Sequence, residues 1–271
     1  MEYQGKWALI TGASAGIGAT FARIYAAKGA NLILVARRED RLKELASEVK
    51  RAHGVEVKTI AADLADAAAP KIIAGALAQD DTPVDILVNN AGFGLPGFFT
   101  ENDWTAHRDF LELMVNSYAH MTRAFLPGMI ARDYGRVIQV SSVAGLVPGS
   151  AGHTLYGPSK AFLVSFAQSI DAECAGKNVN STALCPGFTY SEFHDVNKTR
   201  GLVSQLPKYM FMKAEPVVEG AINAVERGHV VYVPGAWNKF TVWLAKALPR
   251  PWAAAMVRNQ SKRFRRKKGD G

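Results

Sequence analysis

The sequence predicts an α/β protein with one doubly wound sheet of seven parallel strands and helices on both faces. Short apolar runs alternate with longer segments of helical periodicity, which is the pattern of successive βαβ units. A glycine-rich turn joins the first apolar run to the first helical segment. The length of 271 residues, with 48% hydrophobic and 21% charged residues, suits a single domain of this class.

The strands are expected where short apolar runs end in a turn, because strands covered by helices on both faces need nearly continuous apolar sequence. These runs cover residues 7–11, 31–35, 55–60, 85–89, 135–140, 179–184 and 230–233. The helices are expected to end at Gly29, to cover 39–53 and 67–78, to include 113–119, to cover 158–175, and to run from 215 to about 228. We expect this domain to occupy residues 1–235 and residues 236–271 to form an amphipathic basic extension.

Cysteine usage and the chain's first residues exclude several classes of protein. Cys174 and Cys185 are the two cysteines, so a disulfide scaffold is excluded, and no metal-ligand spacing appears. The N-terminal residues lack a basic region followed by a long apolar run, and no apolar stretch is long enough to span a bilayer. We therefore expect a cytoplasmic protein without a metal site. Much of the net charge of +8 lies near the C-terminus.

The turn after the first strand carries glycines in the spacing Thr-Gly-x-x-x-Gly-x-Gly, from Thr11 to Gly18. Glycines permit a tight turn and the close approach of a pyrophosphate, and the helix that follows offers backbone N–H groups and partial positive charge. The alternative is a plain tight turn. The phosphate interpretation predicts that a dinucleotide contacts Gly12, Ser14, Gly16, Ile17 and Gly18.

The second strand ends in Ala36, Arg37 and Arg38. An acid at this place would bind the ribose 2′-hydroxyl of NAD, whereas guanidinium groups suit a 2′-phosphate. We therefore predict NADP(H) rather than NAD(H) as the cofactor. Arg37 is the better candidate, with Ser14 as its hydroxyl partner. The alternative is that both arginines are solvated at the start of the next helix.

Three further strand ends carry polar or small residues that would meet at the carboxyl edge of the sheet. The third strand delivers Asp63 and Leu64, and the fourth runs into Asn89-Asn90-Ala91-Gly92. Asp63 is also a candidate cap for the following helix. The loop 93–99, rich in glycine and phenylalanine, is expected to line the apolar wall of a substrate pocket.

Tyr156 and Lys160 are four residues apart, so on a helix they share one face. A nearby cation favours the phenolate, which would make Tyr156 a proton donor or acceptor closer to neutral pH. A serine after the fifth strand would point to the same edge, and Ser141 and Ser142 compete for this role. The alternative for the first pair is an exposed tyrosine and lysine at a helix start.

These motifs, in this order and together with Pro186-Gly187, resemble the short-chain dehydrogenase/reductase family over about residues 5–235. The resemblance implies a Rossmann fold and reversible hydride transfer between NADP(H) and a carbonyl or alcohol. It implies that Tyr156 is the general acid in reduction, and that Lys160 lowers the pKa of Tyr156 and binds the nicotinamide ribose. It selects Ser142, which precedes x-Ala-Gly, to orient the carbonyl, with Ser141 as the fallback.

The resemblance also implies roles for residues outside the Tyr156–Lys160 pair. Asn116 would bend its helix locally and hold a water of the proton relay, although a buried amide satisfied by backbone is the alternative. The remaining cofactor contacts implied are Asp63 and Leu64 at the adenine, Asn90, Ala91 and Gly92 below the ribose, and Pro186, Gly187 and Thr189 at the carboxamide. Thr189 stands where the family usually has valine.

Residues 190–213 are expected to form a lid, whose aromatic residues and methionines suit a lipophilic substrate such as a 3-oxoacyl or steroid-like ketone. Aromatic and basic residues alternate in 236–271, which end in a polybasic run at 262–268. This pattern favours peripheral contact with an anionic membrane over packing on a partner subunit. Nucleic acid binding is not expected, because the basic residues are confined to the tail. A homodimer or homotetramer is expected.

Two competing functions remain open at this point. One is a non-catalytic NADP(H)-binding sensor, which would usually have lost the tyrosine or lysine that this chain retains. The other is a membrane-surface protein on the same fold, whose nucleotide site would be structural only.

Overall fold

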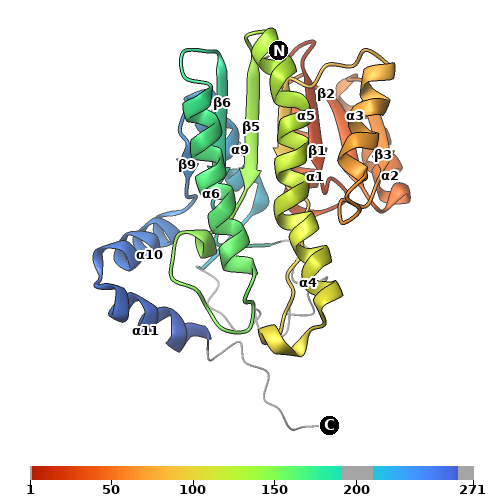
Figure 1. The fold of residues 1–271 in the computed structure, drawn as a ribbon. Coiled ribbons are helices and arrows are strands. Elements are labelled where there is room, and N and C mark those ends of the chain that lie inside the picture. Colours follow the sequence, from red (N-terminus) through yellow and green to blue (C-terminus); the bar gives the residue numbers. More distant parts are fainter. Residues whose placement is uncertain (1, 191–209, 262–271) are drawn as a thin grey trace.

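The computed structural model describes residues 2–190 and 210–261 (Figure 1). Its main sheet has seven parallel strands in the order β3-β2-β1-β4-β5-β6-β9, which confirms the predicted fold class. The strands are β1 (Trp7–Thr11), β2 (Asn31–Ala36), β3 (Val57–Ala61), β4 (Ile86–Asn89), β5 (Gly135–Val140), β6 (Val179–Leu184) and β9 (Val231–Tyr232).

The strand order reverses next to β1, which begins the chain in the middle of the sheet. Leu9 of β1 pairs with Ile33 of β2 on one side and with Leu87 of β4 on the other. The chain winds outward to β3 and then returns to build the other half. The loops that leave β1 and β4 therefore diverge at their carboxyl ends, which is where doubly wound sheets bind ligands.

Helices cover both faces of the sheet (Figure 1). One face carries α1 (Gly16–Ala27), α2 (Glu39–His53) and α9 (Ala214–Glu226), and the other carries α3 (Ala69–Gln79), α5 (Ser117–Ala131) and α6 (Tyr156–Glu173). Neighbouring residues of β1 show the two layers, because Ala8 and Ile10 pack under the first set and Leu9 under the second. This double burial explains why the strands read as continuous apolar runs.

Helix α6 starts at Tyr156, two residues before the start expected at residue 158. Pro158 is tolerated as the third helical residue, because the first backbone N–H groups of a helix have no partner within it. The helix expected around 113–119 consists of three pieces: α4 (Trp104–Leu111), the π-helical turn η2 (Glu112–Asn116) and α5.

A second, two-stranded sheet pairs β7 (Phe188–Thr189) with β8 (Phe211–Met212), at the two ends of the predicted lid. Two short 3-10 helices, η1 (Phe99–Glu101) and η3 (Val143–Gly145), follow β4 and β5. The helices α10 (Ala236–Ala247) and α11 (Arg250–Ser261) follow β9. Most of the lid (191–209) and the polybasic run (262–268) lie outside the described residues. Among the described helices, none is both long enough and apolar enough to cross a bilayer.

Candidate active site

The glycine turn packs tightly against the loop that follows β4. Gly12 and Gly16 have φ values of +65° and +54°, which favour glycine. A Cβ atom on Gly18 would lie 2.3 Å from the carbonyl oxygen of Gly12 and 2.6 Å from Nδ2 of Asn90. Glycine is therefore required at residue 18 by packing alone. We call this turn and the start of α1 the glycine cradle. Ala15 caps α1 without a side-chain hydrogen bond, so backbone N–H groups of the first helical turn can bind an anion.

The side chains of Asn89 and Asn90 hold the loop after β4 to the neighbouring strands and to α5. Asn90 donates from Nδ2 to the backbone oxygen of Thr11 at 2.9 Å, and its backbone N–H donates to Oγ1 of Thr11 at 2.8 Å. Asn89 donates from Nδ2 to Gln139 on β5 and to Thr122 on α5, both at 3.1 Å. These bonds set the position of the backbone at Ala91, which also donates to Oγ1 of Thr11, at 3.0 Å.

At the end of β2, Arg38 rather than Arg37 lies against Ser14. Arg38 donates to Oγ of Ser14, from Nη2 at 3.0 Å and from Nε at 3.3 Å, whereas Arg37 lies 3.7 Å from the carboxylate of Asp63 in an exposed ion pair. Arg38 is therefore the arginine that lies against Ser14, and which of the two arginines contacts a cofactor phosphate stays a prediction. Successive residues of extended backbone point to opposite sides, and Arg38 is the one on the side of the glycine turn.

Asp63 and Leu64 have different environments. Oδ1 of Asp63 accepts from the backbone N–H of Ala65 at 3.1 Å, whereas α3 begins only at Ala69. Asp63 thus caps a turn and not the helix, which corrects the expected helix cap. Leu64 is 4% exposed and packs in the core between the sheet and α3. The Asp63 carboxylate remains half-exposed at the carboxyl edge of the sheet.

The hydroxyl groups of Tyr156 and Ser142 are hydrogen-bonded to each other. Tyr156 is the first residue of α6 and is half-buried, and Lys160 lies one turn later, 4% exposed, with Nζ 5.7 Å from the centre of the Tyr156 ring. Ser142 follows β5 directly, and its Oγ accepts from the backbone N–H of Ala144. The structure therefore brings three of the four predicted catalytic side chains together at the carboxyl ends of the central strands.

Burial dominates the proton affinities of this group. It raises the pKa of Tyr156, and the hydrogen bond with Ser142 opposes this effect. It lowers the pKa of Lys160 to about 7. The expectation that Lys160 lowers the pKa of Tyr156 is therefore wrong for this geometry. Because burial disfavours the charged form of each group, Tyr156 keeps its proton near neutral pH.

The structure distinguishes the two adjacent serines. Oγ of Ser141 donates to the backbone oxygen of Lys160 at 2.7 Å and is turned into the packing of α6 against the sheet. Ser142 points the other way, to Tyr156. Gly145, three residues on, allows this packing, because a Cβ atom there would lie 2.6 Å from the backbone of Lys160. The geometry supports Ser142, the candidate that the resemblance selects.

Asn116 ends the π-helical turn η2, so the local distortion expected of its helix is present. Its side chain is exposed, and Nδ2 donates to Oε2 of Glu112 at 2.7 Å. The expected alternative, a buried amide, is therefore wrong. Tyr118, which sequence reasoning missed, is the residue of this region that approaches the site. Its hydroxyl donates to the backbone oxygen of Ala91 at 2.9 Å, and Nζ of Lys160 lies 5.7 Å from the centre of its ring.

Comparison with known proteins agrees with this geometry. A family model described as short chain dehydrogenase matches residues 6–200, which is more than half of the chain. The chain belongs to the short-chain dehydrogenase family. It is 39% identical to a short chain dehydrogenase of Pseudocercospora fijiensis over 212 residues, covering 76% of this chain and 67% of the relative. It is 29% identical to very-long-chain 3-oxoacyl-CoA reductase-B of Danio rerio, covering 98% and 85%.

Solved structures of this dehydrogenase family superpose over nearly the whole chain. A structure from work on 7beta-hydroxysteroid dehydrogenase stereoselectivity has a TM-score of 0.84 at 26% identity, covering 94% of this chain and 97% of its own. A short-chain dehydrogenase from Sphingobium yanoikuyae in complex with NADPH has a TM-score of 0.78 at 27% identity, covering 98% of both. One from Burkholderia phymatum in complex with NAD has a TM-score of 0.81 at 26% identity, covering 96% and 97%.

In this short-chain dehydrogenase, the loop after β6 closes the site from the side of the C-terminal helices. The backbone oxygen of Pro186 accepts from the backbone N–H of Val143 at 3.0 Å and from Oγ of Ser142 at 3.4 Å. A Cβ atom on Gly187 would lie 2.3 Å from Oδ1 of Asn238, which is 7% exposed on α10. Thr189 follows in β7 and is buried.

Asn238 lies in the segment that the sequence assigned to a separate extension, so its contact with this loop was not expected. Its Nδ2 donates to the backbone oxygen of Pro234 at 2.8 Å. No local sequence pattern identifies such a residue. An asparagine within an apolar and basic segment is at most a weak signal, and its burial is seen only in the structure.

The front wall of the site joins two loops. Gly97 donates from its backbone N–H to the oxygen of Gly152 at 2.9 Å and forms an isolated bridge with His153. This bridge ties the phenylalanine-rich loop 93–99 to the segment just before Tyr156. Phe93 packs edge-on against Phe110, with ring centres 5.4 Å apart, whereas Phe98 is 45% exposed.

Proposed function

We propose that this chain is an NADP(H)-dependent oxidoreductase that interconverts a lipophilic ketone and its secondary alcohol by hydride transfer. One observation carries the proposal: the hydrogen-bonded pair of Ser142 and Tyr156, with Lys160 one helical turn away, lies at the carboxyl end of β5, two strands along the same sheet edge from the glycine turn after β1. The bound cofactor supplies or accepts the hydride.

The protein's own groups handle the oxygen of the substrate. Oγ of Ser142 is positioned to donate to a carbonyl oxygen and to stabilise negative charge that develops on it. In reduction, Tyr156 donates its proton to that oxygen, and its raised pKa keeps the proton on the phenol until this step. In oxidation the same phenol takes the proton back. Lys160 binds the nicotinamide ribose, and Asn116 at the π-helical turn supports the exchange of protons with solvent.

The preference for NADP(H) rests on the end of β2. The sequence there has no acid at 36–38, and Arg38 is held against Ser14 of the glycine turn. A guanidinium group beside a hydroxyl suits a phosphate monoester. Structural relatives with NADPH and with NAD are both similar to this chain, so the arginine carries this part of the proposal.

The preference for a lipophilic substrate rests on side chains at the lid ends and on the front loop. Tyr190 stacks on Phe211, with ring centres 5.0 Å apart, and Phe211 lies 5.6 Å from Phe188. Phe98 and Phe99 are half-exposed on the loop after β4. The names of relatives, a very-long-chain 3-oxoacyl-CoA reductase and a bulky-bulky ketone specific alcohol dehydrogenase from Comamonas testosteroni, favour the same class.

The decisive experiment measures NADPH oxidation against a panel of 3-oxoacyl, steroid and bulky aryl ketones. The wild type should reduce at least one of them, and Tyr156→Phe should lower kcat by about 10²–10⁴ while NADPH binding persists. Tight NADPH binding without turnover of any carbonyl or alcohol would favour the sensor alternative. Turnover unaffected by Tyr156→Phe would contradict the assigned role of Tyr156.

Other expectations from the sequence remain predictions. They are a homodimer or homotetramer, a cytoplasmic location, and peripheral membrane contact through the C-terminal residues. Analytical ultracentrifugation of the full chain tests the first of these.

A further inference from the structure

Helix α10 presents a ridge of aromatic side chains to solvent. Trp237, Phe240 and Trp243 are 42%, 49% and 62% exposed, and their ring centres follow one another at 6.0 Å. Their spacing of three residues places them along one side of the helix. Trp252 on α11 is 68% exposed. Exposed aromatic residues are normal when scattered, but four within sixteen residues of sequence form a patch that indicates a binding surface.

The opposite side of α10 is anchored in the protein. Asn238, Val242 and Ala245 are buried there, and Asn238 packs on Gly187 of the loop after β6. Met212 of β8 also lies 3.7 Å from Nδ2 of Asn238. The ridge is therefore part of an ordered helix whose inner face contacts the candidate active site.

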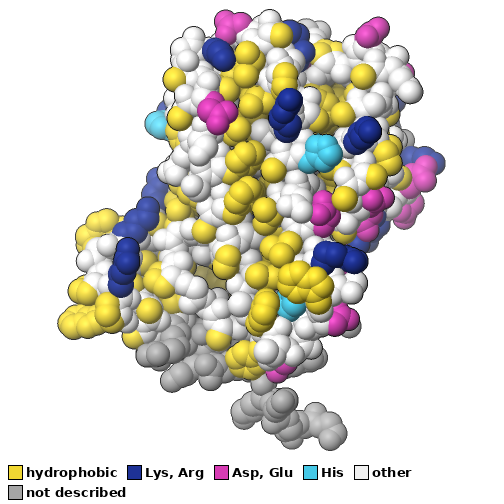
Figure 2. All heavy atoms as spheres, in the orientation of Figure 1, with side chains coloured by type: hydrophobic (Ala, Val, Ile, Leu, Met, Phe, Trp, Pro, Cys, Tyr) yellow, Lys and Arg dark blue, Asp and Glu magenta, His cyan; other side chains and the backbone are white. Residues whose placement is uncertain are grey.

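The C-terminal segment that contains α10 and α11 is strongly basic. Residues 236–271 contain ten of the 32 lysines and arginines of the chain and one of its 24 acidic residues, so residues 1–235 are close to neutral. Lys239, Lys246 and Arg250 belong to the described helices. Figure 2 shows hydrophobic side chains gathered at the lower left, over α10 and α11, with lysine and arginine side chains beside them.

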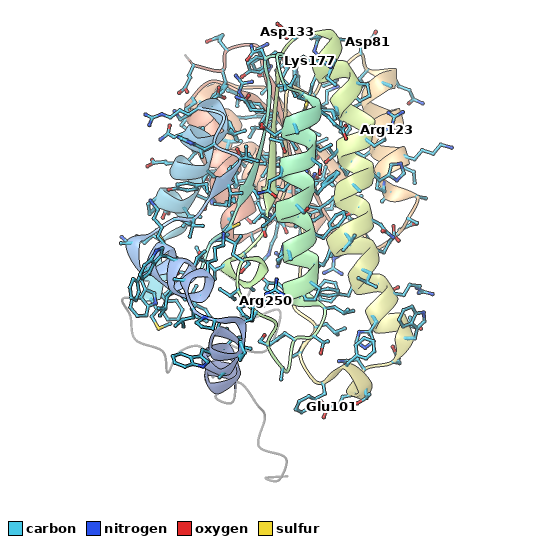
Figure 3. The ribbon with its side chains drawn as sticks, turned by 60° about the vertical axis from the view of Figure 1, so that its left-hand side comes forward. Asp81, Glu101, Arg123, Asp133, Lys177 and Arg250 are labelled. Carbon is cyan, nitrogen blue, oxygen red and sulfur yellow. The ribbon has the colours of Figure 1, made fainter. Side chains whose placement is uncertain are left out.

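We propose that the aromatic ridge of α10, with Trp252 and the flanking cations, docks this protein on an anionic lipid bilayer with its active-site mouth toward the lipid. Tryptophan and phenylalanine on a helix favour the boundary between headgroups and acyl chains, and lysine and arginine beside them attract anionic headgroups. The orientation follows from the fold. Figure 3 shows Arg250 at the same end of the molecule as Glu101, which follows the front loop, and opposite Asp133 and Lys177.

Charge argues against a second copy of the chain as the occupant. A two-fold contact would bring the same cationic patch from both copies together without an acid to pair with in 236–269. Shape argues against single-stranded nucleic acid, because such platforms combine aromatic residues with a groove along the backbone, whereas this ridge projects from one helix. The idea that docking gives access to a lipophilic substrate rests on the proposed function. The docking proposal itself does not depend on that function.

The test is co-sedimentation of the full chain with vesicles of phosphatidylcholine, with and without phosphatidylserine. The wild type should bind the vesicles that contain phosphatidylserine, and added salt should weaken binding. A variant with Trp237→Ser, Phe240→Ser and Trp243→Ser should bind at least about tenfold more weakly, because it loses apolar area for insertion. Trp7→Phe is the control, since Trp7 is half-buried at the start of β1, at the edge of the sheet opposite the candidate active site, and it should bind like the wild type.

A second measurement covers the case in which the triple variant does not fold. Brominated phosphatidylcholine should quench tryptophan fluorescence of the wild type, and the quenching should fall in Trp243→Ser but not in Trp7→Phe. NADPH binding and turnover of a water-soluble ketone are measured on the same proteins, so a failure of the proposed function is seen separately from a failure to dock.

Three results would overturn the docking proposal. They are no wild-type binding to either vesicle, equal binding by the wild type and Trp243→Ser, and a loss of self-association or of oligonucleotide binding in Trp243→Ser without any effect on vesicles.

Discussion

Nζ of Lys160 donates a hydrogen bond to the backbone oxygen of Val140 at 2.7 Å. Val140 is the last residue of β5, and Lys160 is on the first turns of α6, so this bond joins the sheet edge to the helix that carries Tyr156. The lysine is thereby buried without a carboxylate partner among the described residues. Its proton is bound weakly as a result.

A pH dependence of stability follows from this burial. The pKa of Lys160 is about 7 in the fold against 10.5 ordinarily, so between these values the unfolded chain binds more protons and the free energy of unfolding rises with pH. From pH 7 to 9, the wild type should gain about 2 kcal/mol more than Lys160→Met in urea unfolding. Parallel changes in both proteins would mean that Lys160 is protonated throughout this range.

Ser142→Ala and Ser141→Ala should differ in kind. Ser142→Ala removes the hydroxyl that faces Tyr156, and kcat should fall about 10²–10³-fold. Ser141→Ala removes the bond to the backbone of Lys160, and it should cost about 1 kcal/mol of unfolding free energy with less than about a tenfold loss of kcat. Steady-state kinetics and urea unfolding of both variants check this. A similar loss of kcat in both would contradict the assignment.

Arg38→Ala should change cofactor preference more than Arg37→Ala. Charge-assisted hydrogen bonds contribute about 1.5–3 kcal/mol, so the ratio of NADPH to NADH affinity should fall at least about tenfold when Arg38 is lost. Arg37 is 68% exposed and faces Asp63, so its loss should have a smaller effect. Fluorescence titration with both cofactors gives the ratio. A fall confined to Arg37→Ala would restore the original sequence prediction.

Gly18→Ala and Gly75→Ala compare glycines in two helices. A methyl group on Gly18 meets the backbone of Gly12 and the amide of Asn90, so Gly18→Ala should lower stability by about 1–3 kcal/mol and weaken NADPH binding. Gly75 in α3 is exposed with open space at its Cβ position, so Gly75→Ala should raise stability by about 0.5–1 kcal/mol. Thermal and urea unfolding check both signs. Destabilisation by Gly75→Ala would point to a contact of α3 outside the described residues.

Much of the fold and of the site could be predicted from the sequence because both depend on local patterns. Strands buried on both faces must be apolar throughout. The bounds expected for β1, β2, β5 and β6 from apolar runs therefore agree with the observed bounds to within one residue. Polar residues at strand ends meet at one edge of a parallel sheet, so Ser142 and Tyr156 could be expected to meet before any contact was seen. The pair β7–β8 has no such signal, and the distortion of the helix at Asn116 could be expected only from the family resemblance.

The sequence by itself determined the sheet, the glycine cradle and the kinds of side chain at the candidate site. Only the tertiary structure shows how neighbours differ: Ser141 bonds the backbone of Lys160, and Arg38, not Arg37, lies against Ser14. The reason is that adjacent residues of extended backbone point to opposite sides, and which side faces the site depends on how the strand end packs against distant helices. The tertiary structure likewise decided the proton affinities of Tyr156 and Lys160 and brought Asn238 to Gly187, because burial and long-range packing leave no local pattern.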